Sequence, residues 1–253
     1  MSDRILRYDQ ALREAIAQEM GLDPTVVVFG LDVDDWRGIY GTTKDLHREF
    51  GADRCFHTPL SEDAMTGAAV GMALAGLRPV HVHIRMDFLL LAMNQLVNIA
   101  AKARYMYGGA VKVPIVVRSI IGRSWGQGAQ HSQGLHSLFM HIPGLKVVAP
   151  TTAYDAKGAL MASIRDDDPV MFVEHRLVHG LQGHVPEEPY EVPVGTSRTL
   201  LEGSDLTIVG ISHFALEAVR AAHMLREVGI SAEVVDPVWL QPMDVDGIVE
   251  SVR

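Results

Sequence analysis

The sequence predicts an α/β protein with a parallel β-sheet and helices on both faces. Short apolar runs such as Thr25–Gly30 alternate with helical patterns over the first 180 residues. A continuous apolar run of this length is typical of a strand covered on both faces, and strands that alternate with helices form parallel sheets. Ligands of such sheets collect at the carboxyl ends of the strands, so the residues that follow each strand are the candidates for a site.

The composition narrows the classes of function. The chain has 253 residues, 48% of them hydrophobic, enough for one large domain or for one domain and part of a second. Its 22 basic and 31 acidic residues give a net charge of -9, which argues against nucleic-acid or anionic-membrane partners. No apolar run is long enough to cross a bilayer, and we expect residues 1–20 to be an amphipathic charged segment rather than a secretory signal. The single cysteine, Cys55, fits a reducing compartment, so we expect a cytoplasmic protein.

The first unit is expected to span residues 1–180. Helices are expected over residues 5–20, 43–50, 63–75, 87–105 and 153–164, and strands over 25–30, 55–58, 80–84, 113–119, 146–149 and 170–174. The segment 87–105 is apolar on nearly every side, and such a helix must be buried all round, which indicates a subunit interface. A glycine-rich loop is expected over 122–134.

A proline- and glycine-rich linker is expected over residues 181–204, followed by a second unit over 205–253. The second unit shows strands over 206–211 and 231–235 and a helix between them that ends at Gly229. Two strands and two helices do not bury a sheet properly. We therefore interpret the second unit as truncated, or as completed by something outside this sequence.

The stretch Thr58–Glu62 carries the first candidate functional group. Ser61 is placed to cap the following helix through its hydroxyl, and Glu62 then occupies the first helical position, facing the edge of the sheet. An acid in the first turn can also simply complement the helix dipole. Glu62, Phe88 and the glycine-rich loop all follow strand ends, and we expect them to share one edge.

Two other motifs suggest chemistry on weaker grounds. Gly122–Gly126 matches the G-x-S-x-G nucleophile elbow around Ser124, but the glycine-rich segment that follows is a poor start for the required helix. His81 and His83 alternate on one strand face, a spacing that zinc ligands use, although His136 or His141 would have to be recruited from a distance.

Two loops have alternative interpretations. Asp166-Asp167-Asp168 is either a solvated turn or part of a monovalent-cation site built from oxygen ligands. His131, at the end of the glycine-rich loop, is either a surface residue or an acid–base group with a tuned pKa.

Taken together, the chain resembles the β subunits of the thiamine-diphosphate-dependent 2-oxoacid dehydrogenases, which include pyruvate, branched-chain 2-oxoacid and acetoin dehydrogenases. The resemblance runs in family order from about Ile5 to Arg253. It rests on Thr58-Pro59-Leu60-Ser61-Glu62, Gly76-Leu77-Arg78-Pro79, Met86-Asp87-Phe88, Gln95-Leu96-Val97-Asn98, Ala101-Lys102, Gln130-His131-Ser132-Gln133, His141 to Val148, Asp155-Ala156-Lys157-Gly158, Ile164-Arg165-Asp166 before Pro169-Val170, and Val185-Pro186-Glu187-Glu188.

The resemblance implies a transketolase-like pyrimidine-binding domain and gives the candidate residues roles. Glu62 would hydrogen-bond the aminopyrimidine ring of thiamine diphosphate and stabilise the tautomer that removes the thiazolium C2 proton, while the cofactor acts as the electron sink. Phe88 would pack on the pyrimidine, with Leu60 and Met86 as further cofactor contacts. His131 would assist acyl transfer to a lipoyl group.

The family also binds metal ions and partners. Ile115, Ser163, Ile164, Asp166 and Asp168 match its cation loop, which implies K⁺. The Mg²⁺–diphosphate grip uses a Gly-Asp-Gly motif, and this chain has none. The resemblance therefore implies an α subunit that supplies Mg²⁺ and the diphosphate half in an α2β2 assembly, a lipoyl-bearing acyltransferase core, and a small 2-oxoacid substrate.

Three positions depart from the family. Leu31 and Val82 stand where acids are common, and His136 replaces another acid. The family's C-terminal domain also continues beyond the position of Arg253, which puts docking to the lipoyl-bearing acyltransferase core in doubt. Two alternatives remain open: a non-catalytic assembly subunit, and an acetoin- or transketolase-like enzyme without lipoyl transfer.

Overall fold

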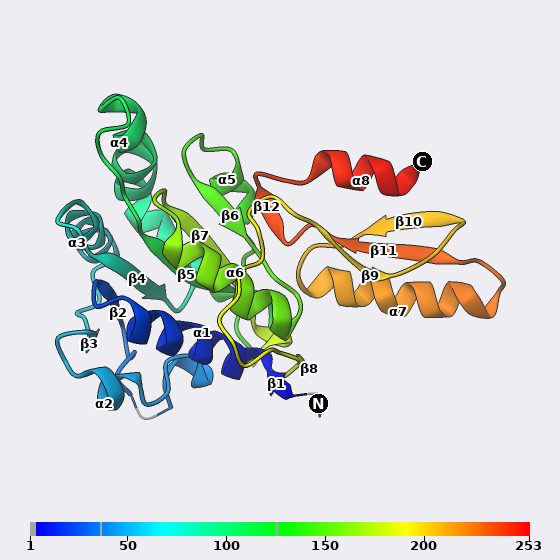
Figure 1. The fold of residues 1–253 in the computed structure, drawn as a ribbon, viewed down its shortest axis with the longest axis horizontal. Helices are drawn as coiled ribbons and strands as arrows, with labels where there is room; N and C mark the ends of the chain where they lie inside the picture. Colours follow the sequence, from blue (N-terminus) through cyan, green and yellow to red (C-terminus); the bar gives the residue numbers. More distant parts are fainter. Residues whose placement is uncertain (1–3, 36, 125) are drawn as a thin grey trace.

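The computed structural model describes residues 4–35, 37–124 and 126–253. Figure 1 shows a larger unit around a seven-stranded sheet and a smaller unit around a three-stranded sheet. The larger sheet has the order β12-β6-β7-β5-β4-β2-β3, and only the β12–β6 pair is antiparallel among its described strands. Its strands are β2 (Val26–Gly30), β3 (Cys55–His57), β4 (Arg78–His83), β5 (Val116–Ile121), β6 (Lys146–Val148), β7 (Val170–His175) and β12 (Trp239–Gln241). The predicted parallel sheet is therefore present.

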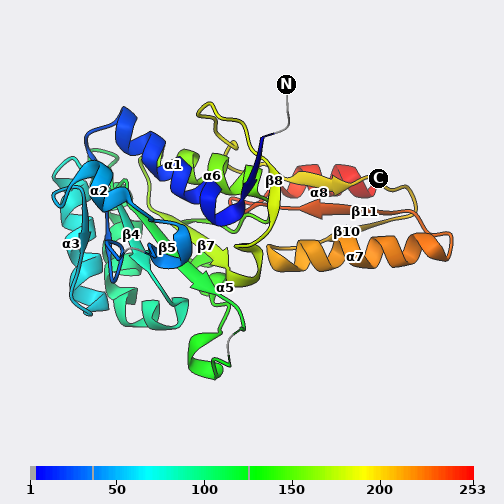
Figure 2. The same cartoon turned by 90° about the horizontal axis from the view of Figure 1, so that it is seen from below.

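Helices cover both faces of this sheet (Figure 2). One face carries α1 (Tyr8–Leu22) and α6 (Ala153–Arg165), and the other carries α3 (Glu62–Leu74), the segment that follows β4, and α5 (His136–Met140). The shorter segments are η1 (Ile39–Gly41), α2 (Leu46–Phe50), η4 (Ala129–His131) and η5 (Arg176–Val178). Across the described ranges, no helix combines the length and the apolar character needed to span a membrane.

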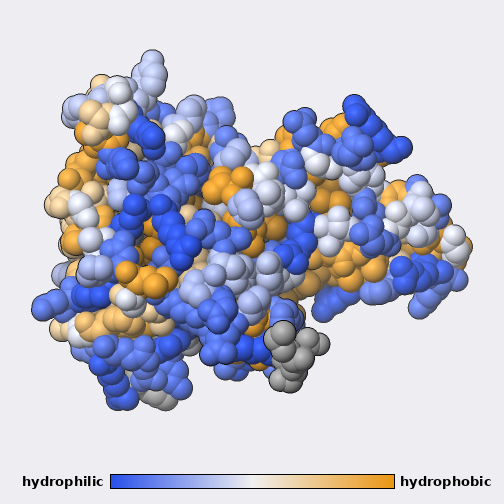
Figure 3. All heavy atoms as spheres, viewed as in Figure 1, coloured by the Kyte–Doolittle hydropathy of each residue, from blue (hydrophilic) through white to orange (hydrophobic). Residues whose placement is uncertain are grey.

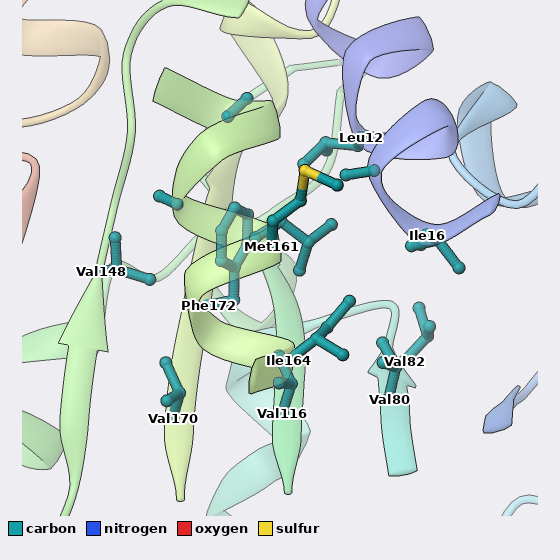
Figure 4. Close-up of a cluster of buried hydrophobic side chains, with 14 of the residues drawn as sticks. Leu12, Ile16, Val80, Val82, Val116, Val148, Met161, Ile164, Val170 and Phe172 are labelled. Carbon is teal, nitrogen blue, oxygen red and sulfur yellow. The ribbon is translucent and has the colours of Figure 1, made fainter. Parts of the chain in front are cut away.

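The two faces bury separate apolar layers. Figure 4 shows the layer under α1 and α6, where Leu12, Met161 and Ile164 meet the valines of the sheet and Phe172. All of these labelled side chains are almost fully buried. Because both faces are covered, most strand positions carry apolar residues, which explains the continuous apolar runs in the sequence.

The segment after β4 differs from the single long helix predicted over 87–105. It consists of the 3₁₀ turns η2 (Met86–Ala92), the π-helical η3 (Asn94–Ala100) and α4 (Ala101–Met106). Only one side is buried, and Leu90, Leu91 and Ile99 are 43%, 62% and 40% exposed. The prediction of one continuous helix is therefore wrong, whereas the predicted subunit interface stays a prediction, since no described element of this chain covers the second side. Figure 3 shows apolar surface along this edge of the larger unit.

The predicted linker contains two strands that the composition did not reveal. β8 (Gln182–His184) pairs with β1 (Ile5–Arg7), a strand at the start of the predicted first helix. β9 (Arg198–Leu201) pairs with β11 (Ala232–Asp236) in the smaller sheet.

The smaller unit also contains β10 (Leu206–Val209), α7 (His213–Glu227) and α8 (Val245–Val252). β12 leaves this unit and joins the larger sheet beside β6. Hydrogen bonding therefore ties residues 181–253 to the larger sheet, and the unit boundaries proposed from composition stay a prediction.

Candidate active site

A pocket of about 300 Å³ lies at the carboxyl ends of β2, β3 and β4. Leu60, Glu62, Phe88 and His131 all line it, although they come from three separate segments of the chain. The sequence predicted that these residues would share one edge of the sheet, and the structure brings them together there.

Glu62 owes its position to the break between β3 and α3. β3 ends at His57, Pro59 follows, and α3 begins at Glu62 as predicted. Ser61 occupies the N-cap, but its hydroxyl makes no capping hydrogen bond, so that detail of the prediction is wrong. Glu62 is half-buried, and within the described ranges its carboxylate has no hydrogen-bond or ion-pair partner. An acceptor left open in a pocket is available to a ligand.

Phe88 and His131 line the pocket next to each other. Their ring centroids lie 5.3 Å apart with the planes at 82°, an edge-to-face contact. The glycine-rich loop that carries His131 is held in place by Arg176, which donates to the His131 carbonyl oxygen at 3.0 Å, and by the Gln133 side chain, which donates to the Asp87 carboxylate at 2.8 Å. Met86 is fully buried in the core and is not part of the pocket lining, so its predicted cofactor contact stays a prediction.

His81 and His83 belong to the pocket wall, a role that the sequence did not predict. They are 2% and 8% exposed, and their rings lie 4.8 Å apart. Burial lowers the pKa of His81 to about 3 and that of His83 to about 4, so both are neutral at pH 7. No third histidine, cysteine or acid in the described part of the chain completes a metal site with them, and the zinc alternative therefore has no support.

Two of the three residues that depart from the family, Leu31 and Val82, line the same pocket, whereas His136 lines a separate cavity. Leu31 and Val82 are apolar wall residues, so Glu62 is the sole acid among the lining residues that the structure describes. Their neighbour Arg85 brings a positive charge to the pocket rim. A single carboxylate among apolar, aromatic and neutral imidazole groups suits an uncharged heteroaromatic ring better than a phosphate.

A buried ion pair lies under this edge of the sheet. Arg118 on β5 donates to both carboxylate oxygens of Glu174 on β7, at 2.7 and 2.9 Å, and both side chains are 1% exposed. His179 Nε2 lies 3.3 Å from the same carboxylate. Burial alone would raise the pKa of Glu174, but the Arg118 charge and His179 hold it below its usual range. The pair fixes the two strands side by side.

The predicted cation loop is tightly paired with basic side chains. Arg78 donates to the carbonyl oxygens of Ile164 and Asp166 at 3.1 and 3.0 Å, and Lys146 contacts the carboxylates of Asp166 and Asp168. The Ile115 carbonyl accepts from the Val170 N–H at 2.9 Å. The Ser163 hydroxyl donates to the Ala159 carbonyl. These residues adjoin one another, and a K⁺ ion there stays a prediction.

The nucleophile-elbow alternative lacks its helix. The first helical segment after Ser124 is η4, a short 3₁₀ segment that begins at Ala129. Trp125, inside the motif, lies outside the described residues.

Fold and site together define a transketolase-like protein. Residues 5–180 match the family model described as "Transketolase, pyrimidine binding domain", and residues 195–253 match "Transketolase, C-terminal domain". Among solved structures, "Split gene transketolase, inactive beta4 tetramer" aligns with a TM-score of 0.80 at 22% identity, covering 97% of this chain and 76% of that one. A transketolase from Leishmania mexicana aligns with a TM-score of 0.72 at 14% identity, over 96% of this chain and 36% of that one.

Curated relatives narrow the class. The chain is 45% identical over 260 residues to the acetoin:2,6-dichlorophenolindophenol oxidoreductase subunit beta of Cupriavidus necator, covering 99% of this chain and 77% of that protein. It is 42% identical over 250 residues to the pyruvate dehydrogenase E1 component subunit beta of Porphyra purpurea, covering 99% and 75%. The chain belongs to the β subunits of the thiamine-diphosphate-dependent 2-oxoacid dehydrogenase family, which confirms the resemblance found in the sequence.

Proposed function

We propose that the Glu62 pocket holds the aminopyrimidine ring of thiamine diphosphate and that Glu62 holds the proton exchanged with that ring. The observation that carries the proposal is the open, half-buried Glu62 carboxylate in a pocket with Phe88 and His131. When bound, the cofactor supplies a nucleophilic carbon and an electron sink. Phe88 would contact the face of the pyrimidine ring, and Leu60 would be a further contact of the cofactor. His131 would assist the transfer of the acyl group.

The diphosphate half must come from another chain. The sequence has no Gly-Asp-Gly motif, and no cluster of metal-ligating side chains occurs in the described ranges. We therefore propose an α subunit that binds Mg²⁺ and the diphosphate, in an α2β2 assembly. The exposed apolar side of η2 and η3, with Leu90, Leu91 and Ile99, supports a subunit contact at that edge (Figure 3).

The substrate in this proposal is a small 2-oxoacid, and the acyl group passes to a lipoyl-bearing acyltransferase core in the cytoplasm. Acetoin is the second candidate substrate, favoured by the 45% identity to an acetoin oxidoreductase subunit. A K⁺ ion near Asp166 and Asp168 would have a structural role with either substrate.

Reconstitution tests the proposal. The chain is coexpressed with a partner that carries Gly-Asp-Gly, and reduction of dichlorophenolindophenol is followed with pyruvate, branched-chain 2-oxoacids or acetoin. We expect turnover only with both chains, thiamine diphosphate and Mg²⁺. Acyl transfer to an added lipoyl domain separates a dehydrogenase from an enzyme without lipoyl transfer. A complex that assembles and binds the cofactor but turns over none of these substrates would favour the non-catalytic alternative.

A further inference from the structure

A second and larger cavity, of about 1100 Å³, lies between the two units of the chain. It is formed where β5, β7 and β10 end and where α7 begins, and Figure 2 shows α7 starting beside the end of the larger sheet. We call it the interdomain cleft. The loop after β5 separates it from the Glu62 pocket, since His131 lines the pocket and Ser132 lines the cleft.

Basic side chains from both units line the interdomain cleft. Arg123 and His175 come from the larger unit, and His213 and Arg220 come from α7. The His175 and His213 rings stack with centroids 4.8 Å apart. Burial, followed by the neighbouring charges of His213, Arg176, His179 and Arg123, lowers the pKa of His175 to about 4. His175 is therefore neutral at pH 7, and the Arg123 and Arg220 guanidinium groups carry the fixed positive charge of the described lining.

The one acidic group among the described lining residues is Glu217, on the same helix. Its carboxylate pairs with Arg220 and lies 3.4 Å from His213 Nε2. Glu217 therefore competes with any incoming anion for these two partners. Removing the Glu217 charge should therefore strengthen the binding of an anion, whereas removing the Arg220 charge should weaken it.

The start of α7 also borders the interdomain cleft. α7 is 15 residues long, and its dipole favours an anion near its N-terminus. The N–H groups of Phe214 and Ala215 already donate to the Ile211 and Ser212 carbonyl oxygens, at 3.0 and 2.9 Å. Ser212, at the N-cap, lines the cleft and is 3% exposed, yet its hydroxyl neither caps the helix nor meets another partner in the described residues. A buried hydroxyl without a partner is costly unless something outside the chain satisfies it.

We propose that the interdomain cleft binds the phosphate group of a small phosphorylated molecule. The Arg123 and Arg220 guanidinium groups suit phosphate oxygens, and the Ser212 hydroxyl supplies a neutral donor at the positive end of the α7 dipole. The cleft volume lies just above the usual range of small-molecule sites, about 300–1,000 Å³, and Ile211 and Phe214 provide apolar surface for an organic part. The site is separate from the cofactor pocket and does not depend on the function proposed there.

Calorimetric titration of the full chain with inorganic phosphate and with adenosine monophosphate, against sodium chloride at equal ionic strength, tests this site. We expect saturable binding of both phosphates, tighter for the nucleotide if the apolar wall contributes. Arg220→Gln should weaken binding about tenfold, while Glu217→Gln should tighten it. The matched control Arg226→Gln, on the last turn of the same helix, should change nothing.

The proposal is overturned by the absence of saturable phosphate binding up to about 1 mM, or by equal affinities in the wild type, Arg220→Gln and Glu217→Gln. Because Arg220 and Glu217 are exposed or half-exposed, both variants should keep the wild-type melting temperature. If Arg220→Gln nevertheless unfolds, Arg123→Gln from the other unit gives the same test, and its unchanged affinity would equally count against the site.

Discussion

The Glu62 pocket and the interdomain cleft lie on the same edge of one sheet but offer opposite chemistry. The pocket follows β2, β3 and β4 and holds one open carboxylate among apolar and neutral aromatic groups. The cleft follows β5 and β7 and gathers arginines, histidines and a helix N-terminus. The parallel sheet fixes where ligands can bind, whereas the few residues after each strand decide which ligand is bound.

The largest expected effect is the loss of catalytic activity when Glu62 of the pocket is replaced. In the complex with the α subunit, Glu62→Gln should lower kcat about 10²- to 10⁴-fold, because the amide cannot take up the proton that the ring exchanges. The neighbouring Asp63→Asn is the matched control, since both acids lie in the first turn of α3. If the acid only complements the helix dipole, both variants should instead lose the same small amount of stability, about 0.3–1 kcal/mol, with kcat intact.

Breaking the Arg118–Glu174 pair should damage both regions together. Arg118→Met leaves Glu174 buried between β5 and β7 without its arginine partner and with only His179 Nε2 within 3.3 Å, and should cost about 3–5 kcal/mol in the free energy of unfolding. Urea denaturation measures the loss. A cost below about 1 kcal/mol, typical of a surface pair, would mean that these strands do not depend on the pair.

The buried histidines of the Glu62 pocket should make folding sensitive to acid. Their pKa values of about 3 and about 4 lie below the ordinary 6.5, so the unfolded chain binds protons first and stability falls as the pH drops from about 6.5 towards 4. Each histidine contributes up to about 1.4 kcal/mol per pH unit in this window. Urea midpoints at several pH values should show a shallower slope in the double variant His81→Leu/His83→Leu.

Two features keep this measurement interpretable. Burial raises the pKa of the Asp236 carboxyl to about 7, which makes its contribution fall as the pH rises, so the difference between variant and wild type is the quantity to compare. The exposed His223→Gln should keep the wild-type slope. Identical slopes in all three proteins would show that His81 and His83 do not titrate as buried groups.

The smallest expected effect is on cofactor affinity, when an aromatic residue of either region is replaced. Phe88 lines the pocket and Phe214 lines the interdomain cleft. Phe88→Ala should weaken thiamine diphosphate binding to the complex about 3- to 10-fold, the range of an aromatic contact worth 0.5–1.5 kcal/mol, whereas Phe214→Ala should leave it unchanged. Equal effects on cofactor affinity would indicate that the two sites are not independent.

The sequence predicted the sheet and the position of Glu62 because both follow from local patterns. Continuous apolar runs mark covered strands, and Pro59 before an acid and an apolar helix marks the start of α3. The short strands β8, β9 and β12 were missed, because their pairing with β1, β11 and β6 depends on distant parts of the chain. The break of the predicted helix over 87–105 into η2, η3 and α4 left no mark in apolar periodicity.

The candidate site was predicted in part for the same reason. Glu62, Phe88 and His131 follow strand ends, so topology alone brings them together. The places of His81 and His83 in the pocket wall could have been suspected from two polar residues on a covered strand, a pattern that needs an explanation wherever it occurs. The interdomain cleft was not predictable from the sequence. Its lining comes from segments as far apart as Ile121 and Arg220, and these segments meet only after the smaller unit folds against the larger.

The most direct test of the central claim is the rate at which the thiazolium C2 proton of thiamine diphosphate exchanges with deuterium, measured by NMR after acid quenching. With Mg²⁺ and both subunits, we expect rapid exchange that falls about 10²- to 10⁴-fold in Glu62→Gln and that neither chain supports alone. Rapid exchange with this chain by itself, or an unchanged rate in Glu62→Gln within the intact complex, would contradict it.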